Sequence, residues 1–266
     1  MEDVESFKNL PLALFGTISP AELARYEKQL QLPSWGRAVQ ERLKNSRVFI
    51  AGGGNLTAAT AFYLARAGVG HLRLVDLERV SLVDLGDQVP YRERDLNRPK
   101  AAVLEQRLQE INPFAAVEGL ERKISDHNVL KLTQTFNLLI GDLQPYRQAL
   151  ALNRAALRHG MPLLLGWIQE WRGFVATLRP GQGLCLACTD LQNRLSDAIS
   201  QPAPLSAVIG GILALEALRL LGDGRPALVE RLFSFDGNEY RCARETLLPA
   251  LSTCPVCGRS HAQSKG

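Results

Sequence analysis

Four of the five cysteines in this 266-residue sequence form two Cys-x-x-Cys pairs in distant segments. The first pair is Cys185 and Cys188, and the second is Cys254 and Cys257. Two thiolates at this spacing can reach one ion, and two such pairs complete a tetrahedral site of four thiolates. Because the protein would supply all four ligands, we predict a structural zinc site that has no open position for catalysis.

Two other chemistries fit Cys-x-x-Cys pairs, namely disulfide bonds and a redox-active dithiol. Disulfides are rare in proteins without an export signal, and the first residues, MEDVESFKNL, are acidic and polar rather than a secretory signal. A redox pair usually opens a helix, whereas Pro255 and Gly258 favour a loop turn. Zinc is therefore the preferred interpretation. The fifth cysteine, Cys242, lies in a strand-like run, and we interpret it as a small apolar core residue rather than a nucleophile.

A glycine turn, formed by Gly52, Gly53 and Gly54, is the second feature that could support chemistry. It follows a short apolar run at 47–51 and precedes apolar residues at helical spacing over 56–65. A turn that leaves a strand and opens a helix directs free backbone N–H groups and the positive end of the helix dipole at one spot. Glycines allow a phosphate to approach this backbone, so the turn is a candidate phosphate site.

The next strand-like run, residues 72–75, ends at Asp76, where an acid can bind the hydroxyl groups of a ribose. Strand, glycine turn, helix, strand and acid form the layout of a nucleotide-binding βαβ unit. The usual pattern is Gly-x-Gly-x-x-Gly, and Thr57 replaces its third glycine here. A tight strand-to-helix turn without a ligand stays open as the alternative.

Composition limits the class of protein. An apolar fraction of 46% and a charged fraction of 22% are ordinary for a globular protein. The net charge of +4 comes from 31 basic and 27 acidic residues without a clustered basic stripe, so we expect no nucleic-acid partner. The apolar stretch 205–221 contains Glu216 and Arg219, so we expect a buried or subunit-facing helix rather than a membrane span. We therefore expect a cytoplasmic protein.

Apolar periodicity and turn residues predict an α/β fold of the Rossmann-like, nucleotide-binding type with a mixed sheet. We expect a single domain over 1–266, with a flexible arm (1–18), N-terminal helices (19–45), a nucleotide-binding part (46–166) and an antiparallel C-terminal part held by the zinc site (167–260). Beyond the βαβ unit, the predicted helices are 100–112, 126–135 (capped by Ser125 or Asp126), 148–159 and 205–221, and the predicted strands are 115–120, 138–140, 162–165, 230–235 and 239–245.

Several further motifs stand at characteristic positions. They are Arg25-Tyr26-Glu27-Lys28-Gln29, the segment from Tyr63 to Gly70, Asp76-Leu77-Glu78-Arg79-Val80, the pair Asn112-Pro113, and CPVCG at 254–258. With the glycine turn and the cysteine pairs, they make the chain resemble the ThiF/MoeB/HesA family, the bacterial relatives of ubiquitin-activating enzymes. The resemblance extends over residues 25–258.

This resemblance implies an adenylyltransferase activity. Family members bind ATP and Mg²⁺ and transfer AMP to the C-terminal Gly-Gly carboxylate of a ubiquitin-like sulfur-carrier protein, with release of pyrophosphate. The step makes chemical sense because a carboxylate is a poor electrophile, whereas an acyl-adenylate carries a good leaving group. The resemblance also implies a dimer, either a homodimer or a heterodimer with a family relative.

The resemblance assigns roles to residues of this sequence. Lys100 stands at the position of the phosphate-binding lysine and is the one candidate catalytic residue that is retained. The implied nucleotide-binding residues are Gly52, Gly54, Asp76, Glu78, Gln88 and Lys100, together with Lys28 from the partner subunit.

Several catalytic positions depart from the family pattern. Asp87 replaces the catalytic arginine, and Asp84 replaces an asparagine of the same motif. Gln144 replaces the magnesium-binding aspartate, although Asp142 lies nearby. The crossover segment 189–204 contains no cysteine for a thioester or persulfide. An arginine offsets the negative charge that develops at the phosphates, whereas an aspartate in its place would repel the triphosphate.

Two hypotheses follow for the function. The first is a divergent adenylyltransferase in which Lys28, Arg92, Arg94 and Arg98 act as substitute groups at the triphosphate. The second is a catalytically inactive family member that acts as a carrier-binding or heterodimer partner subunit. An NAD-dependent dehydrogenase fits less well, because the zinc would be closed and no proton donor is placed for hydride transfer.

Overall fold

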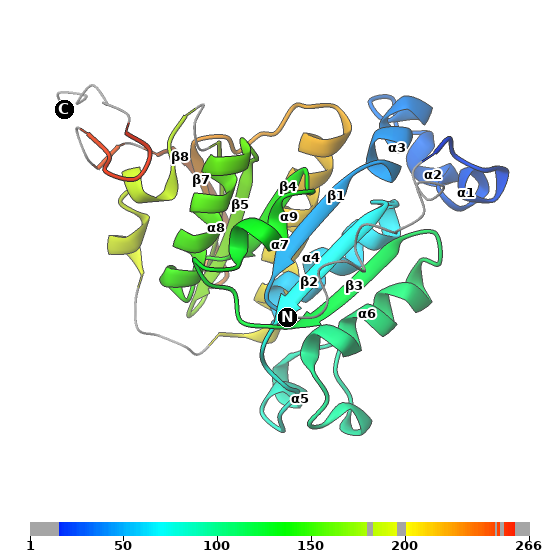
Figure 1. The fold of residues 1–266 in the computed structure, drawn as a ribbon, viewed down its shortest axis with the longest axis horizontal. Helices are drawn as coiled ribbons and strands as arrows, with labels where there is room; N and C mark the ends of the chain where they lie inside the picture. The colour runs from blue at the N-terminus through cyan, green and yellow to red at the C-terminus, as the bar shows by residue number, and fades with distance from the viewer. Residues whose placement is uncertain (1–15, 180–182, 196–200, 248, 251–252, 259–266) are drawn as a thin grey trace.

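The computed structural model of the protein describes residues 16–179, 183–195, 201–247, 249–250 and 253–258. Most of the predicted N-terminal arm, residues 1–15, therefore lies outside the described residues. Within the described part, eight strands form one mixed sheet in the order β3-β2-β1-β4-β5-β6-β7-β8 (Figure 1). The strands are β1 (Arg47–Ala51), β2 (His71–Asp76), β3 (Ala116–Glu121), β4 (Leu138–Asp142), β5 (Leu163–Gln169), β6 (Arg172–Leu178), β7 (Arg231–Asp236) and β8 (Arg241–Thr246).

The sheet consists of a parallel part and an antiparallel part. The first five strands in spatial order, β3 to β5, pair in parallel. The strands β6, β7 and β8 then pair antiparallel to their neighbours. The prediction of a mixed sheet is confirmed, and the antiparallel strands continue the same sheet as the nucleotide-binding part.

Both faces of the central strands are buried, as expected for parallel strands covered by helices. In β1, Val48 and Ile50 point to one hydrophobic cluster, while Phe49 and Ala51 point to the other. Helices α3 (Gly36–Lys44), α4 (Asn55–Ala67), α6 (Lys100–Ile111) and α9 (Ala203–Gly222) supply the first cluster. Helices α7 (Val129–Thr133) and α8 (Tyr146–His159) supply the second.

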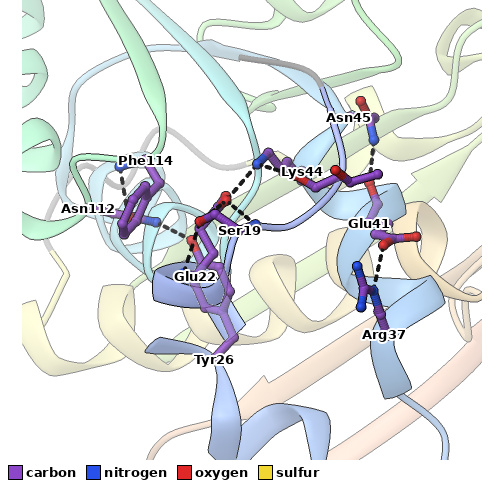
Figure 2. A network of polar contacts seen from close by, with 10 residues as sticks. Ser19, Glu22, Tyr26, Arg37, Glu41, Lys44, Asn45, Asn112 and Phe114 are labelled. Carbon is purple, nitrogen blue, oxygen red and sulfur yellow. Dashed lines mark hydrogen bonds and ion pairs between the residues drawn. The ribbon is translucent and has the colours of Figure 1, made fainter. Parts of the chain in front are cut away.

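Polar contacts join the N-terminal helices to one another and to the end of α6 (Figure 2). Helix α1 (Pro20–Arg25) begins with a capping box between Ser19 and Glu22, and Lys44 Nζ donates to Glu22 Oε2 at 2.6 Å. Helix α2 (Glu27–Leu30) follows after a break at Tyr26. Asn112 Nδ2 donates to Tyr26 Oη at 2.9 Å, and this contact ties the break to the end of α6.

The segment between β2 and α6 contains the short helix α5 (Asp84–Asp87) and the turn η3 (Glu93–Asp95), and it projects from one end of the sheet (Figure 1). Buried Asp95 holds it in place, because its carboxylate pairs with Arg107 of α6 at 3.0 Å and with Arg98 at 2.9 Å. The segment is thus fixed on α6 rather than free.

Most predicted elements are confirmed, with three corrections. The helix predicted at 126–135 is shorter, because Ser125 N donates to Asn128 Oδ1 and the first turn remains a loop before α7. The strand predicted at 162–165 extends to Gln169, because Trp167 and its neighbours pair with β6 in a hairpin. Helix α8 begins at Tyr146 rather than at residue 148.

Helix α9 is long and apolar enough to cross a membrane by length and composition alone, with half of its most apolar window buried in the fold. It packs on α4, β5 and β6. Its one carboxylate, that of Glu216, is buried and accepts hydrogen bonds from Leu228 N at 2.6 Å, Ala227 N at 2.9 Å and the Thr177 hydroxyl at 3.1 Å. Such a satisfied buried acid is typical of a core helix.

Candidate nucleotide pocket and metal centre

The predicted nucleotide-site residues gather around a cavity of about 360 Å³ at the C-terminal ends of β1, β2 and β4. Strands β1 and β4 are neighbours, and the strand order reverses between them, which is where open α/β sheets bind ligands. The predicted residues that line the cavity are Gly52, Gly54, Asp76, Glu78, Gln88 and Gln144. Lys28, Asp87 and Lys100 do not line it. We call this cavity the nucleotide pocket, and the roles of its residues remain predictions.

The glycine turn has the conformation that the sequence predicts. Gly52 adopts φ of +104°, which favours glycine, and its N–H donates to Val75 O at 2.9 Å. A side chain at Gly53 would meet Lys100 Cβ and Tyr91 Oη, each at 3.1 Å. Thr57, at the position of the third glycine, donates its hydroxyl to Gly54 O at 3.2 Å. The threonine therefore closes the turn internally.

Asp76 connects the end of β2 to the glycine turn. Its Oδ2 accepts the N–H of Gly53, and its Oδ1 accepts the N–H of Glu78 at 2.6 Å. Burial raises the pKa of this carboxyl above its usual range, although both backbone hydrogen bonds oppose the shift. A ribose hydroxyl would have to share these oxygens with the backbone.

Lys100 is only 3% exposed, and its ammonium lies between two carboxylates. Nζ is 2.7 Å from Glu78 Oε2 and 2.8 Å from Asp84 Oδ1. Burial alone would lower the pKa of Lys100, but the hydrogen bonds to Asp84 and Glu78 outweigh it and raise the pKa. The lysine is therefore charged and already paired, so a phosphate would have to compete with two acids for it.

The two aspartates of α5 differ in environment. Burial would raise the pKa of Asp84, but contacts with Lys100 and with the hydroxyl and N–H of Ser81 lower it overall. For Asp87, burial and the nearby charge of Asp84 raise the pKa. The Asn55 side chain donates to the main-chain oxygen of Asp87 at 2.7 Å, so this short helix is bound to the start of α4.

Asp142 lines the nucleotide pocket at the end of β4. Gln144 N donates to its Oδ1 at 2.9 Å, and the described residues offer it no ion-pair partner. Burial raises the pKa of this carboxyl to about 7, and backbone hydrogen bonds from Gln144 and Leu143 only partly offset the effect. Asp142 is thus the acid of the pocket whose protonation changes near neutral pH.

The cationic side chains at the pocket are not the predicted substitutes. Arg92, Arg94 and Arg98 are absent from its lining, and Arg98 pairs with Asp95 instead. The lining includes Arg122 and Lys123, which sequence reasoning missed. They directly follow β3, and the C-terminal ends of parallel strands meet at one edge of a sheet, so their position after a predicted strand was the available signal.

The predicted metal ligands converge in one cluster. The four ligand sulfurs of Cys185, Cys188, Cys254 and Cys257 lie within 4.8 Å of one another. Three of the Sγ to Sγ distances are 3.3, 3.4 and 3.8 Å, which are too long for disulfide bonds. Sulfurs bound tetrahedrally at about 2.3 Å from an ion would lie about 3.8 Å apart, so the cluster could hold a metal ion.

The surroundings of the cysteines argue against the redox alternative. Cys185 precedes a single 3-10 turn, Leu186–Cys188, rather than an α-helix. Three of the four thiols are buried, and only Cys257 is partly exposed. The fifth cysteine is a correction, because Cys242 is exposed on β8 and does not fill the core. Strand β8 is exposed along its whole length, and periodicity alone does not reveal such an edge.

A family model described as the ThiF family matches residues 26–256. A Thermus thermophilus protein named sulfur carrier protein adenylyltransferase is 34% identical over 254 residues, which cover 91% of this chain and 93% of that protein. An Escherichia coli protein named sulfur carrier protein ThiS adenylyltransferase is 31% identical over 248 residues, covering 91% of this chain and 97% of that protein. The crystal structure of Escherichia coli MccB with ATP has a similar fold, with a TM-score of 0.76, 21% identity, and coverage of 88% of this chain and 73% of that one.

Asp142→Asn is expected to stabilise the protein at alkaline pH. The carboxyl of Asp142 has a pKa of about 7 in the folded protein and about 4 in the unfolded chain. Its ionisation therefore lowers the free energy of unfolding progressively as the pH rises from about 4 to about 7. The variant should raise the melting temperature by several degrees at pH 8 and leave it nearly unchanged at pH 4. Thermal unfolding followed by circular dichroism measures both. Exposed Asp223→Asn is the control, and equal shifts in the two variants would contradict the prediction.

Proposed function

Because this chain belongs to the ThiF family, we propose that it activates a ubiquitin-like sulfur-carrier protein by transferring AMP from ATP to its C-terminal Gly-Gly carboxylate. Relatives with the names of sulfur-carrier adenylyltransferases align with nearly the whole chain. ATP use is typical of the family. The carrier tail would enter the open side of the nucleotide pocket, and we expect the reaction to take place in the cytoplasm.

One observation carries this proposal. The glycine turn, the acid Asp76 and Gln88 line one cavity at the reversal of strand order. A phosphate group fits at the start of α4 because its N-cap residue is Gly54 and no side chain caps this helix, although the N–H of Gly53 is already bonded to Asp76. A ribose fits next to it at Asp76.

The proposed reaction is a substitution at the α-phosphorus of ATP. A carboxylate oxygen of the carrier forms a bond to this phosphorus, and the bond from phosphorus to the bridging oxygen of pyrophosphate breaks. The protein aligns the two anions and offsets the charge that develops between them. Lys100 can contribute to this only if the triphosphate displaces Glu78 or Asp84 from its ammonium.

Magnesium would have an altered set of ligands here. Mg²⁺ prefers carboxylate and phosphate oxygens, and it would neutralise the triphosphate. Gln144 offers a neutral amide at the family's acidic position, whereas the carboxylates of Asp142 and Glu78 line the same pocket. We propose that Asp142 takes the place of the missing acid.

The charges around Lys100 support a second candidate function, that of an inactive partner subunit. Glu78, Asp84 and Asp87 surround one lysine, and the arginine that would stabilise the transition state is absent. Removal of one such stabilising donor typically slows catalysis about 100-fold to 1,000-fold. In this case the protein would bind a carrier or an active relative without adenylating it.

We also propose that zinc occupies the cysteine cluster. Four thiolates without a carboxylate or an imidazole are typical of structural zinc. The ion would connect the segment after β6 with the segment after β8, because the paired cysteines Cys185 and Cys254 lie 69 residues apart in the sequence. It would have no open position for a substrate.

A dimer would use the outer face of α4 and α9. An apolar groove of about 560 Å³ lies there, and its lining includes the exposed residues Tyr63, Val208 and Leu215. Gln29 lines the same groove, so the adjacent Lys28 of α2 would lie at the edge of the interface. Exposed Lys28 could then extend towards the partner's nucleotide pocket.

Exchange of labelled pyrophosphate into ATP tests the proposed activity. We expect slow exchange with the wild type and a ubiquitin-like sulfur carrier that ends in Gly-Gly, and none with a carrier that lacks these glycines. Asp87→Arg should increase the rate about 100-fold, since it restores a positive charge at the phosphates. Lys100→Ala should abolish exchange.

The outcomes separate the two candidate functions. Exchange that survives Lys100→Ala would place the reaction elsewhere in the chain. If the wild type shows no exchange and the double variant Asp84→Asn, Asp87→Arg restores it, the protein is better explained as the inactive subunit. Absence of exchange in every variant, together with no binding of Mg·ATP at millimolar concentration, would refute the adenylyltransferase proposal.

Cys254→Ser is expected to remove the metal and to lower stability by several kcal/mol, since a structural zinc site contributes directly to folding. Metal content by mass spectrometry should fall from one zinc per chain to near zero, with an earlier thermal transition. Cys242→Ser is the matched control, because this cysteine is exposed and lies outside the cluster. An unchanged zinc content in the first variant would rule out the proposed ligands.

Leu215→Glu is expected to disrupt the dimer, because it places a charge in the apolar groove between α4 and α9. Sedimentation velocity should show a shift from dimer to monomer. Tyr240→Glu changes another exposed apolar side chain, outside the groove, and should leave the dimer intact. A wild type that sediments as a monomer at tens of micromolar protein would contradict the proposal.

A further inference from the structure

A second cavity opens beside the nucleotide pocket. It has a volume of about 440 Å³ and lies between the segment that follows β3 and the start of α8. The two cavities share the lining residues Lys123, Pro145 and Gln148. A ligand of sufficient length can therefore extend from one into the other. We call the second cavity the Arg147 pocket.

The lining of the Arg147 pocket is positively charged. Lys123 and Arg147 both line it, and the described residues offer neither side chain a hydrogen bond or an ion pair. The single acid of the lining, Asp126, is already paired with Arg154. That ion pair, together with the charges of Arg147 and His127, lowers the pKa of Asp126, so the acid is ionised and neutralised by Arg154. The cations of the pocket thus remain available to a ligand.

The start of α8 adds to this potential. The first turn of this 14-residue helix contains no acidic residue, and Pro145 at its N-cap position makes no side-chain hydrogen bond. The helix dipole therefore contributes positive potential at Arg147 and Gln148. Lys123 belongs to a separate element, the segment after β3. Two elements therefore contribute cations to the same cavity.

The opposite end of the nucleotide pocket has the reverse character. Behind its lining at that end, the buried cation Lys100 is paired with Glu78 and Asp84, and Asp87 adds a further negative charge. Unpaired positive charge is thus found beyond the end of β3 rather than next to α5. An anionic group would meet less competition in the Arg147 pocket than at Lys100.

We propose that the Arg147 pocket is an anion-binding subsite that takes a phosphate group through Lys123 and Arg147. The phosphate is either part of the nucleotide in the adjacent pocket or a free phosphate ion bound beside it. This subsite deepens the proposed function, because it adds a contact to the same ligand region, but it does not require that AMP is transferred.

Isothermal titration calorimetry of the full chain with orthophosphate, adenosine and ATP tests this proposal. Arg147→Ala and Lys123→Ala should each weaken orthophosphate binding about tenfold, since each removes a charge-assisted contact. Arg158→Ala removes the same charge from the exposed far end of α8 and should behave as the wild type. Adenosine, which has no phosphate, should bind the wild type, Arg147→Ala and Arg158→Ala equally. Because the three substituted side chains are exposed, their melting temperatures should match the wild type.

Competition identifies the source of the phosphate. If the nucleotide supplies it, orthophosphate competes with ATP and both variants weaken ATP; if the ion is separate, orthophosphate and ATP bind together. Orthophosphate binding that is absent in the wild type, unchanged in both variants, or equally weakened in Arg158→Ala would overturn the proposal. Lys100→Ala should leave orthophosphate binding intact, so a failure of pyrophosphate exchange and a failure of this subsite are distinguishable.

Discussion

The ammonium of Lys100 lies between the carboxylates of Glu78 and Asp84, and this interaction sets the charge behind the nucleotide pocket. A buried lysine needs negative partners, and removal of one partner of such a pair leaves an uncompensated charge. The pair also fixes the segment after β2 against the start of α6. The same contacts that stabilise this end of the fold therefore reduce the positive charge that a triphosphate would find there.

Sheet topology explains why the candidate groups meet. The parallel strands place the ends of β1, β2, β3 and β4 at one edge, so residues from distant segments line one pocket. The antiparallel strands β6 to β8 contribute no residue to the lining of this pocket. They instead bring the second cysteine pair to the first. The nucleotide pocket and the cysteine cluster thus lie at separate parts of one sheet.

Periodicity and glycine spacing were sufficient to predict β1, α4, β2 and the place of Asp76, because a βαβ unit is a local pattern. The convergence of the four paired cysteines was also predictable, since the pairs have a spacing that few other chemistries use. Pairing between side chains was not predictable. Arg98 was expected at the triphosphate, but it pairs with buried Asp95, and Arg122 and Lys123 line the pocket only because β3 lies beside β2. Such neighbours are set by tertiary structure and leave no local signature.

The separation of the two cysteine pairs has a consequence for synthesis of the chain. Translation delivers Cys185 and Cys188 first, and the ribosome must add a further 69 residues before Cys257 can join Cys188. During that interval the first pair has no second pair with which to complete a site of four thiols. An ion held by all four thiols could therefore be captured only after the segment that contains β7 and β8 has been synthesised.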